Sequence, residues 1–363
     1  MLYLGIDQHS KQLTVNLRNE AGDVMLHRQV STQPTKVRQF FEELARRAQP
    51  EGGYVAIVEV CGFNDWLLDL LPTVGCREVV LVQPTRRSRR KTDFRDAAAL
   101  SELLWVNRGR LLGGHGIQGL RRVYIATATE REGRKLTALR REKGAERTQI
   151  INRIKHLLAC RNLQHDCPTK GIQTAAARQW LQDLPVETLG ALDRLALNQE
   201  LEKWKLLDRQ LKQLTVLIEE QKARHPQARM LSSIPGCGAY TALAIASRVA
   251  GVERFRSPRS LANYFGLVPG CRNSGEATQR LGSITKQGSP IVRFLLGQLV
   301  LHVLRRDPWM RAWYKKLRQR RGSKIARVAV MRRVTTIIWH MLTKQEAYQP
   351  GGPPRQRLAL RKV

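Results

Sequence analysis

Four carboxylates in this chain have the type and spacing for metal-dependent chemistry. Asp7 follows the apolar run LYLGI, Glu59 lies near the end of YVAIVEV, and Asp93 and Asp96 are three residues apart. Residues with that spacing at the start of a helix project from one face. Carboxylate oxygens are the ligands that Mg²⁺ selects, usually together with phosphate oxygens and water. The four acids therefore predict a Mg²⁺ site, and two ions ~4 Å apart could stabilise both oxygens of a phosphoryl transfer.

Each acid alone also has an ordinary structural explanation. An Asp in the first turn of a helix complements the helix dipole, and a Glu at a strand end is usually a solvated edge residue. Asp7 is harder to explain in this way, because an unpaired carboxylate is costly to bury. The metal interpretation gains support from a basic run just before Asp93, which we expect to contact a nucleic-acid backbone: Arg86, Arg87, Arg89, Arg90 and Lys91.

The charge of the chain favours a polyanionic partner. Its 363 residues carry a formal net charge of +33, and this charge is uneven. Residues 1–117 hold 16 basic and 13 acidic side chains, whereas residues 254–363 hold 24 basic side chains and three acids. Nucleic acid is the simplest such partner, since each neutralised phosphate releases counterions. The alternative is a basic protein without a specific ligand.

The sequence gives no sign of a membrane or of an oxidising compartment. No apolar stretch reaches the ~20 residues that span a bilayer, and Met1 leads straight into a strand-like segment. The six cysteines follow no disulfide framework, so we expect reduced thiols in the cytoplasm. A zinc site is the alternative for one group, but its spacing matches no zinc pattern and favours helix-end residues: His156, Cys160, His165 and Cys167.

The front of the chain is expected to form an α/β domain over residues 1–125. Apolar runs and period-two alternation predict five strands, and amphipathic stretches between them predict helices. The strands are expected at 2–7, 12–18, 23–30, 54–60 and 78–84, with helices at 35–48, around Trp66 and from 93 to 107. Three antiparallel strands followed by strand–helix units are typical of an RNase H-like (RuvC-like) fold. That fold presents acids from strand 1, from the end of strand 4 and from a later helix.

Residues 126–225 are expected to form an α-helical, coiled-coil middle region. A long charged helix covers 126–160, and a second helix carries an apolar seam that fits a short coiled coil or hairpin. Packing within the chain and pairing between chains are both compatible with the spacing. The seam residues are Leu197, Leu201, Trp204, Leu207, Leu211, Leu214 and Ile218.

A mainly α domain is expected over residues 226–345, followed by a flexible basic tail at 346–363. The stretch MLSSIPGCGAYTALAIASRV resembles a helix-hairpin-helix, whose glycines let backbone N–H groups approach phosphate. A plain Gly-rich helix turn is the alternative. The last helix, from Gly322 to about Leu342, pairs an inward apolar stripe with basic residues expected to bind nucleic acid. These are Lys324, Arg327, Arg332 and Arg333.

Ser274 is a candidate nucleophile in this back domain. It lies between Asn273 and Gly275, in a loop that also contains basic residues expected to contact nucleic acid: Arg272, Arg280 and Lys286. Such a serine could attack a phosphodiester, with the cations stabilising the added negative charge and a base or metal activating the hydroxyl. The residues alone indicate this weakly, because Ser283 and Ser289 lie close by.

Six segments together are similar to the DEDD transposases of insertion sequence family one-hundred-and-ten. They are GID (5–7), VEV with Glu59, KTDFRDA (91–97), IPGCGAYTA (234–242), YFGLVPGCRNSG (264–275) and GSITKQGSP (282–290). The resemblance covers Met1 to about Leu342. It implies a RuvC-like domain in which Asp7, Glu59, Asp93 and Asp96 bind Mg²⁺. It also implies a C-terminal transposase domain in which Ser274 attacks DNA and forms a covalent phosphoserine link.

The resemblance further implies several partners. These are donor and target DNA, a structured non-coding bridge RNA that selects them, and copies of the same chain in a dimer of dimers with shared active sites. Association with the bacterial nucleoid would follow. The resemblance assigns no role to His9 in the motif GIDQHSK.

Two other readings of the sequence compete with the transposase. One is a RuvC-like nuclease, such as a junction resolvase, in which the acids hydrolyse DNA and Ser274 is structural. The other is a non-catalytic nucleic-acid scaffold.

Overall fold

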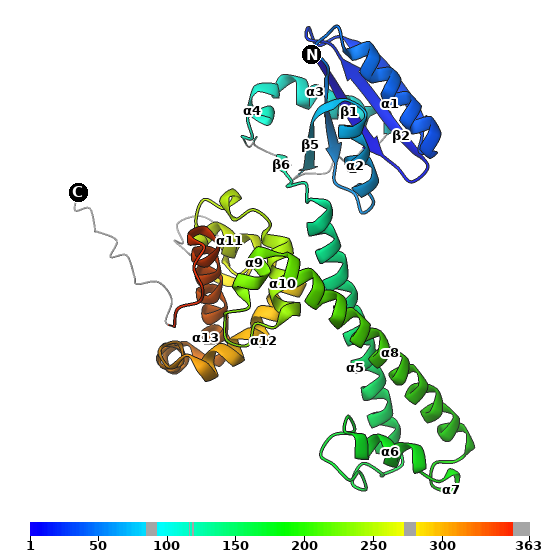
Figure 1. Ribbon diagram of the computed structural model, residues 1–363, viewed down its shortest axis with the longest axis vertical. Coiled ribbons are helices and arrows are strands. Elements are labelled where there is room, and N and C mark those ends of the chain that lie inside the picture. The colour runs from blue at the N-terminus through cyan, green and yellow to red at the C-terminus, as the bar shows by residue number, and fades with distance from the viewer. Residues whose placement is uncertain (85–92, 116, 118–119, 272–280, 351–363) are drawn as a thin grey trace, which may run out of the picture. The chain divides into compact units, whose positions relative to one another are not determined.

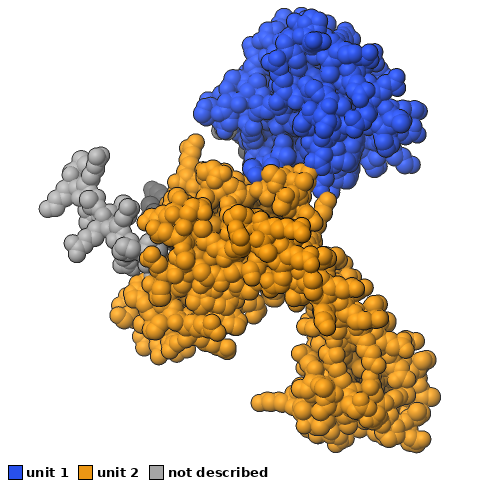
Figure 2. All heavy atoms as spheres, viewed as in Figure 1, with its two compact units in different colours: residues 1–125 blue, residues 126–363 orange. Residues whose placement is uncertain are grey.

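The structure is a computed structural model that describes residues 1–84, 93–115, 117, 120–271 and 281–350. The chain divides into two compact units, Met1–Ile125 and Ala126–Val363 (Figure 1 and Figure 2). The first contains the sheet and the second is almost entirely helical. No helix among these described residues is both long and apolar enough to cross a bilayer.

Unit 1 is built on a six-stranded mixed sheet with strand order β3-β2-β1-β4-β5-β6. β1, β2 and β3 form an antiparallel meander, β4 and β5 run parallel to β1, and β6 pairs antiparallel with β5. The strands are β1 (Leu2–Gln8), β2 (Gln12–Arg18), β3 (Val24–Ser31), β4 (Tyr54–Glu59), β5 (Cys76–Pro84) and β6 (Leu120–Arg122). This arrangement is compatible with the predicted RNase H-like fold. β6 was not predicted, because its three residues LRR carry no strand-like alternation.

Helices cover both faces of the sheet. α1 (Pro34–Ala48) and α2 (Asp65–Thr73) pack on the face that includes Leu4 and Ile6. α3 (Asp93–Val106) and α4 (Arg108–Leu112) pack on the opposite face, with Tyr3 and Ile57. Successive strand residues point to opposite faces, so Asp7 and Glu59 lie on the face covered by α3.

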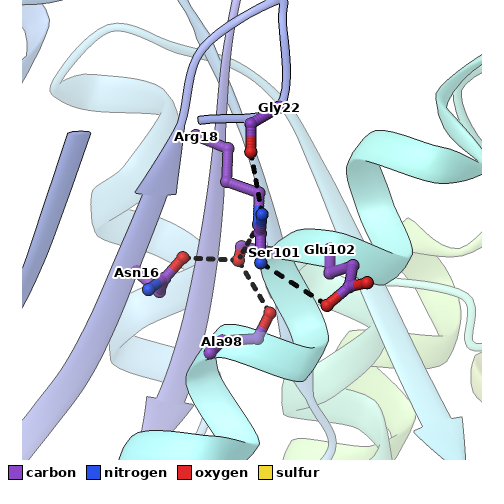
Figure 3. A network of polar contacts seen from close by, with 6 residues as sticks. All are labelled: Asn16, Arg18, Gly22, Ala98, Ser101 and Glu102. Carbon is purple, nitrogen blue, oxygen red and sulfur yellow. Dashed lines mark hydrogen bonds and ion pairs between the residues drawn. The ribbon is translucent and has the colours of Figure 1, made fainter. Parts of the chain in front are cut away.

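A polar network ties α3 to β2 (Figure 3). Ser101 Oγ donates to Asn16 Oδ1 at 2.6 Å and accepts from Arg18 Nε at 3.2 Å. Arg18 also donates to the Gly22 carbonyl at 2.8 Å and lies 3.5 Å from a Glu102 oxygen. Ser101 and Asn16 are buried, so these bonds take the place of water. The network fixes the position of α3 along the sheet.

Gly5 lets α3 rest directly on β1. A Cβ on Gly5 would lie 2.3 Å from the Ala97 carbonyl oxygen and 2.5 Å from the Ser101 nitrogen, both of them backbone atoms. Neither backbone atom can move without shifting the helix. A side chain at this position would therefore push α3 off the sheet.

Gly5→Ala is expected to lower the free energy of unfolding by about 1–3 kcal/mol, the usual cost of overpacking a core. Gly109→Ala is the control, because an added Cβ in α4 meets nothing within 4 Å. That change should leave stability unchanged or raise it slightly. Urea unfolding of both variants measures the difference, and equal midpoints would contradict the close packing of α3 on β1.

Unit 2 begins with two long helices that lie side by side, α5 (Ala128–Cys160) and α8 (Ala191–Arg224), joined by α6 (Ala175–Asp183) and α7 (Val186–Leu189) (Figure 1). All seven predicted seam residues of α8 are buried. Much of the seam packs against α5 of the same chain, at Ile150, Ile151, Ile154 and Leu158. The seam is therefore filled within the chain and is not available to pair two chains.

The remainder of unit 2 surrounds a second apolar core. Its elements are α9 (Pro226–Leu231), α10 (Ala239–Val249), η1 (Val252–Arg254), α11 (Pro258–Tyr264), the strand pair β7 (Pro269–Cys271) and β8 (Leu281–Ile284), α12 (Pro290–Arg306) and α13 (Pro308–Lys344). Gly322 has a φ of 79° and breaks α13, so the predicted C-terminal helix begins there. In the α9–α10 turn, a Cβ on Gly236 would collide with the His302 side chain, so tight packing requires that glycine.

Candidate functional site

Asp7 and Glu59 lie side by side at the carboxyl ends of two parallel strands. The register pairs Ile6 with Val58, which places the next residues, Asp7 and Glu59, opposite each other. Neighbouring strands are about 4.8 Å apart, so the two carboxylates share one small region. The Asp7 side chain is 16% exposed and Glu59 is half-buried. Two partly desolvated acids at this spacing repel each other unless a cation lies between them.

The start of α3 lies at the same end of the sheet. Ala97 rests on Gly5, and eight residues later Trp105 Nε1 donates to the Glu20 carbonyl, beyond the amino end of β1. The helix therefore runs antiparallel to β1, and the residues before Ala97 extend toward Asp7. Asp96 is half-buried, but it does not form a metal-binding group with Asp7 and Glu59 in the described part of the chain. Asp93 is the first residue of α3, although its side chain lies outside the described part.

The surroundings of the two strand acids are electrostatically negative. Burial raises the pKa of the Cys61 thiol, and the Asp7 and Glu59 carboxylates raise it further. Both carboxylates therefore act on the same neighbour. His9 Nε2 lies 3.0 Å from Asp7 Oδ2, which gives His9 a direct contact with the site.

Asn64 links the ends of β1 and β4. It is 5% exposed, and its Nδ2 donates to Gln8 Oε1 at 2.8 Å and to the Glu59 carbonyl at 3.2 Å. Its Oδ1 accepts from the Cys61 N–H. Gln8, also buried, donates to the Phe63 carbonyl at 3.0 Å. Together these bonds hold the backbone next to Asp7 and Glu59 in place.

Asn64→Ala is expected to lower the free energy of unfolding by about 2–3 kcal/mol, because it leaves Gln8 Oε1 and the Cys61 N–H without their partners. Asn19→Ala is the control, since that side chain bonds to Asp23 within an exposed turn, and the change should cost less than about 1 kcal/mol. Denaturant titration of both variants gives the comparison. Equal losses of unfolding free energy in the two variants would show that the Asn64 hydrogen bonds do not stabilise the fold more than an exposed turn does.

The residues present fit a hard divalent cation. Asp7 and Glu59 offer carboxylate oxygens, the ligand type of Mg²⁺. The Thr14 hydroxyl, opposite Asp7 on β2, is buried and has no hydrogen-bond partner among the described residues, so it could bond to a metal-bound water. Within the described part of the chain, no three His, Cys, Asp or Glu side chains gather closely enough to hold an ion by themselves. The Asp93 side chain lies outside that part.

The predicted nucleophile and most of its basic neighbours fall outside the described ranges. These residues are Ser274, Arg272 and Arg280, together with the upstream run of Arg86, Arg87, Arg89, Arg90 and Lys91. The paired strands β7 and β8 bracket residues 272–280, so Ser274 belongs to the connection of a two-stranded hairpin. Lys286 follows β8, is exposed and has a φ of 55°.

The basic residues of the last helix are accessible. Lys324, Arg327 and Arg332 are exposed, and the Arg333 guanidinium lies 5.4 Å from the centroid of the Trp309 ring. Cys160 Sγ lies 3.6 Å from His156 Nε2, but those residues form no metal-binding group with His165 and Cys167 in the region the structure describes.

Sequence reasoning missed three residues at the site, Gln8, Thr14 and Asn64, and gave no role to His9, which contacts Asp7. The only sequence signal was position, since each lies within a few residues of a strand end or pairs across from it.

Comparisons with known proteins match both units. A DEDD transposase model, described as "Transposase", matches residues 4–160, and a model described as "Transposase IS116/IS110/IS902 family" matches residues 228–315. The chain is 30% identical to the transposase for insertion sequence element IS1111A of Coxiella burnetii, over 82% of this chain and 79% of that protein. It is 23% identical to a probable family 20 transposase of Pseudomonas aeruginosa, over 96% and 98%. It is also 26% identical to a putative transposase, y4pF/y4sB, of Sinorhizobium fredii, over 81% and 74%.

Proposed function

We propose that this chain, which belongs to the IS116/IS110/IS902 family of transposases, cuts and rejoins DNA with a site composed of four carboxylates and a serine. The carboxylates are Asp7, Glu59, Asp93 and Asp96, and the serine is Ser274. The observation that carries the proposal is the placement of Asp7 beside Glu59 at the sheet edge where α3 begins. The family establishes the chain as a DNA transposase; the roles of these residues are our proposal.

The proposed cleavage is a transesterification. Ser274 Oγ forms a bond to phosphorus, and the bond from phosphorus to one deoxyribose oxygen breaks. The hydroxyl proton passes to a carboxylate oxygen of the site, and the leaving deoxyribose oxygen takes up a proton. The products are a phosphoserine link and a free hydroxyl end. Attack of another hydroxyl end on that link reverses the step and rejoins the strand.

The carboxylates hold and orient the reacting phosphate in this scheme through Mg²⁺. When bound, Mg²⁺ would supply positive charge that stabilises the phosphate oxygens as negative charge builds up. Asp7 and Glu59 would be its strand ligands, and Asp93 and Asp96 its ligands from α3. The divalent requirement agrees with the DEDD type of the matched family model.

Hydrolysis by the acids alone is the competing mechanism. The purified full chain, incubated with Mg²⁺ and end-labelled DNA that carries the ends of its insertion sequence, separates the two. Strand joining into new combinations supports the proposal. Nicks that carry free phosphate ends, without joining, would show a nuclease of the junction-resolving type.

We also propose that a structured guide RNA selects the donor and target DNA and that the enzyme acts as a dimer of dimers. Two observations support a nucleic-acid partner: the net charge of +33, and the exposed basic residues Lys324, Arg327 and Arg332. RNA extracted from the purified protein tests the guide. A discrete RNA, whose digestion stops DNA joining, is expected, and joining that survives digestion would rule the guide out.

A further inference from the structure

Three helices of unit 2 bring arginines and aromatic rings together, and we name the group the arginine–aromatic cluster. It consists of Arg140 and Arg141 of α5, Tyr240 of α10, and Arg293 and Phe294 of α12. The Arg140 guanidinium lies 5.3 Å from the Tyr240 ring centroid, and that of Arg141 lies 5.7 Å from the Phe294 ring centroid. Arg141 is exposed, and Phe294 is 49% exposed. An accessible ring thus lies beside an accessible cation.

The cluster's two arginines from α5 have no acidic partner in the part of the chain that the structure describes. Neither Arg140 nor Arg141 makes a hydrogen bond or ion pair with any other residue that the structure describes. Burial lowers the pKa of Arg140, although Tyr240 opposes this shift, and Arg147, which pairs with Asp208, lowers it further. Burial likewise lowers the pKa of Arg293, with Arg141 adding to the effect. Cations that repel one another without an acidic partner favour the binding of an anion.

The interior of the cluster contains a further unused polar group. The Tyr240 hydroxyl is buried and has no hydrogen-bond partner within the described ranges. Arg140, Arg141 and Arg248 all act on it electrostatically, so the hydroxyl faces the cationic side of the cluster. The Tyr240 ring contacts the Arg140 guanidinium, and burial raises the pKa of the Tyr240 hydroxyl, so Tyr240 adds no negative charge to the cluster.

Arg293 fastens this cluster to the hairpin that carries Ser274. Its Nη1 donates to the Gln287 carbonyl at 2.8 Å, the Phe265 carbonyl at 3.1 Å and the Gly288 carbonyl at 3.2 Å. Phe265 precedes β7 by four residues, and Gln287 follows β8 by three. The cluster therefore adjoins the base of the strand pair β7–β8, whose connection contains Ser274.

We propose that the arginine–aromatic cluster binds one unpaired nucleotide of the DNA strand that the transposase attacks. Arg140 and Arg141 would contact its phosphate, and Phe294 would stack against its base. Cationic side chains bind the phosphates of any nucleic acid. An exposed aromatic ring, in contrast, stacks on the face of a base, and the bases of an intact duplex do not expose that face. We propose DNA and not RNA because the cluster adjoins the hairpin of Ser274, the residue proposed to attack DNA. This choice of DNA therefore rests on the proposed function.

The test measures binding of a fluorescein-labelled oligothymidylate to the full chain by anisotropy over a range of salt concentrations. Phe294→Leu should weaken binding about tenfold and leave the salt dependence unchanged. Arg141→Gln should weaken it about fivefold and reduce the salt slope by ~0.7, the value for one phosphate contact to a single strand. Phe294→Tyr, which keeps an aromatic face, should bind like the original chain and shows that a loss does not come from misfolding.

Lys155→Gln is the matched control, because Lys155 is exposed on the same helix and the change removes one charge away from the cluster. Its affinity should stay within twofold of the original. A duplex of the same length should be insensitive to Phe294→Leu. Three results would each overturn the proposal. The first is that Phe294→Leu and Arg141→Gln lose no more affinity than Lys155→Gln, and the second is that Phe294→Leu loses as much affinity for the duplex as for oligothymidylate. The third is that the variants lose affinity for an oligouridylate of the same length and not for oligothymidylate. Because no cleavage is measured, the result stands apart from the role of Ser274.

Discussion

Ser274→Ala is expected to reduce DNA strand cleavage and rejoining by at least about a thousandfold, the scale on which removal of a catalytic nucleophile acts. The carboxylates would still hold Mg²⁺, but no serine oxygen would be present to attack the phosphorus. DNA binding and the free energy of unfolding should stay as they were, since the change removes a single hydroxyl group. Gel analysis of labelled DNA measures the loss.

Ser283→Ala is the control for this change, because Ser283 is an exposed serine of β8 in the same hairpin. Its activity should remain within about twofold of the original. If Ser274→Ala cuts and joins DNA as well as Ser283→Ala does, then Ser274 is structural and the acids work without it.

Asp7→Asn is expected to lower activity strongly and to leave the stability of the metal-free chain nearly unchanged. The isosteric amide removes a strand ligand, so strand cleavage should fall at least about a thousandfold at ordinary Mg²⁺ concentrations. Without Mg²⁺, the change removes both the repulsion between residue 7 and Glu59 and the charge that contacts His9, so the free energy of unfolding should change by less than about 1 kcal/mol. Thermal unfolding with and without Mg²⁺ tests this, since added Mg²⁺ should stabilise the original chain and leave the variant unaffected.

Glu102→Gln is the matched control, because Glu102 lies on the same α3 but near the amino end of β1, where it contacts Arg18. It should leave both activity and the stabilisation by Mg²⁺ unchanged. An Asp7→Asn chain that Mg²⁺ still stabilises fully would show that the strand acids hold no ion.

Local patterns were sufficient to predict most of unit 1. The alternation of Leu13, Val15 and Leu17 predicted β2 with its bounds, and the apolar run at 54–60 predicted β4 to within one residue. The burial of these strands determines where their apolar residues lie, and that pattern can be read directly from a single sequence. The short strand β6 was not predicted, because its three residues carry no strand pattern and are a strand through their pairing with β5.

The site could be predicted only where its residues carry charge or end an apolar run. Asp7 and Glu59 met that condition. Asn64 and Thr14 did not, because their importance comes from partners on other strands and loops, such as Gln8 across from the Asn64 amide. Likewise, the apolar spacing of α8 was compatible with two kinds of packing, and only the position of α5 shows that the seam is filled within the chain.

The central claim is that the acids and Ser274 form one composite site, and the direct measurement is a covalent protein–DNA adduct. Labelled DNA is incubated with the full chain and Mg²⁺, denatured, and separated on a gel. We predict an adduct with the original chain that disappears when Mg²⁺ is chelated and disappears in Ser274→Ala. Strand cleavage that persists in Ser274→Ala, without any adduct in the original chain, would contradict the composite site and leave a nuclease driven by the acids alone.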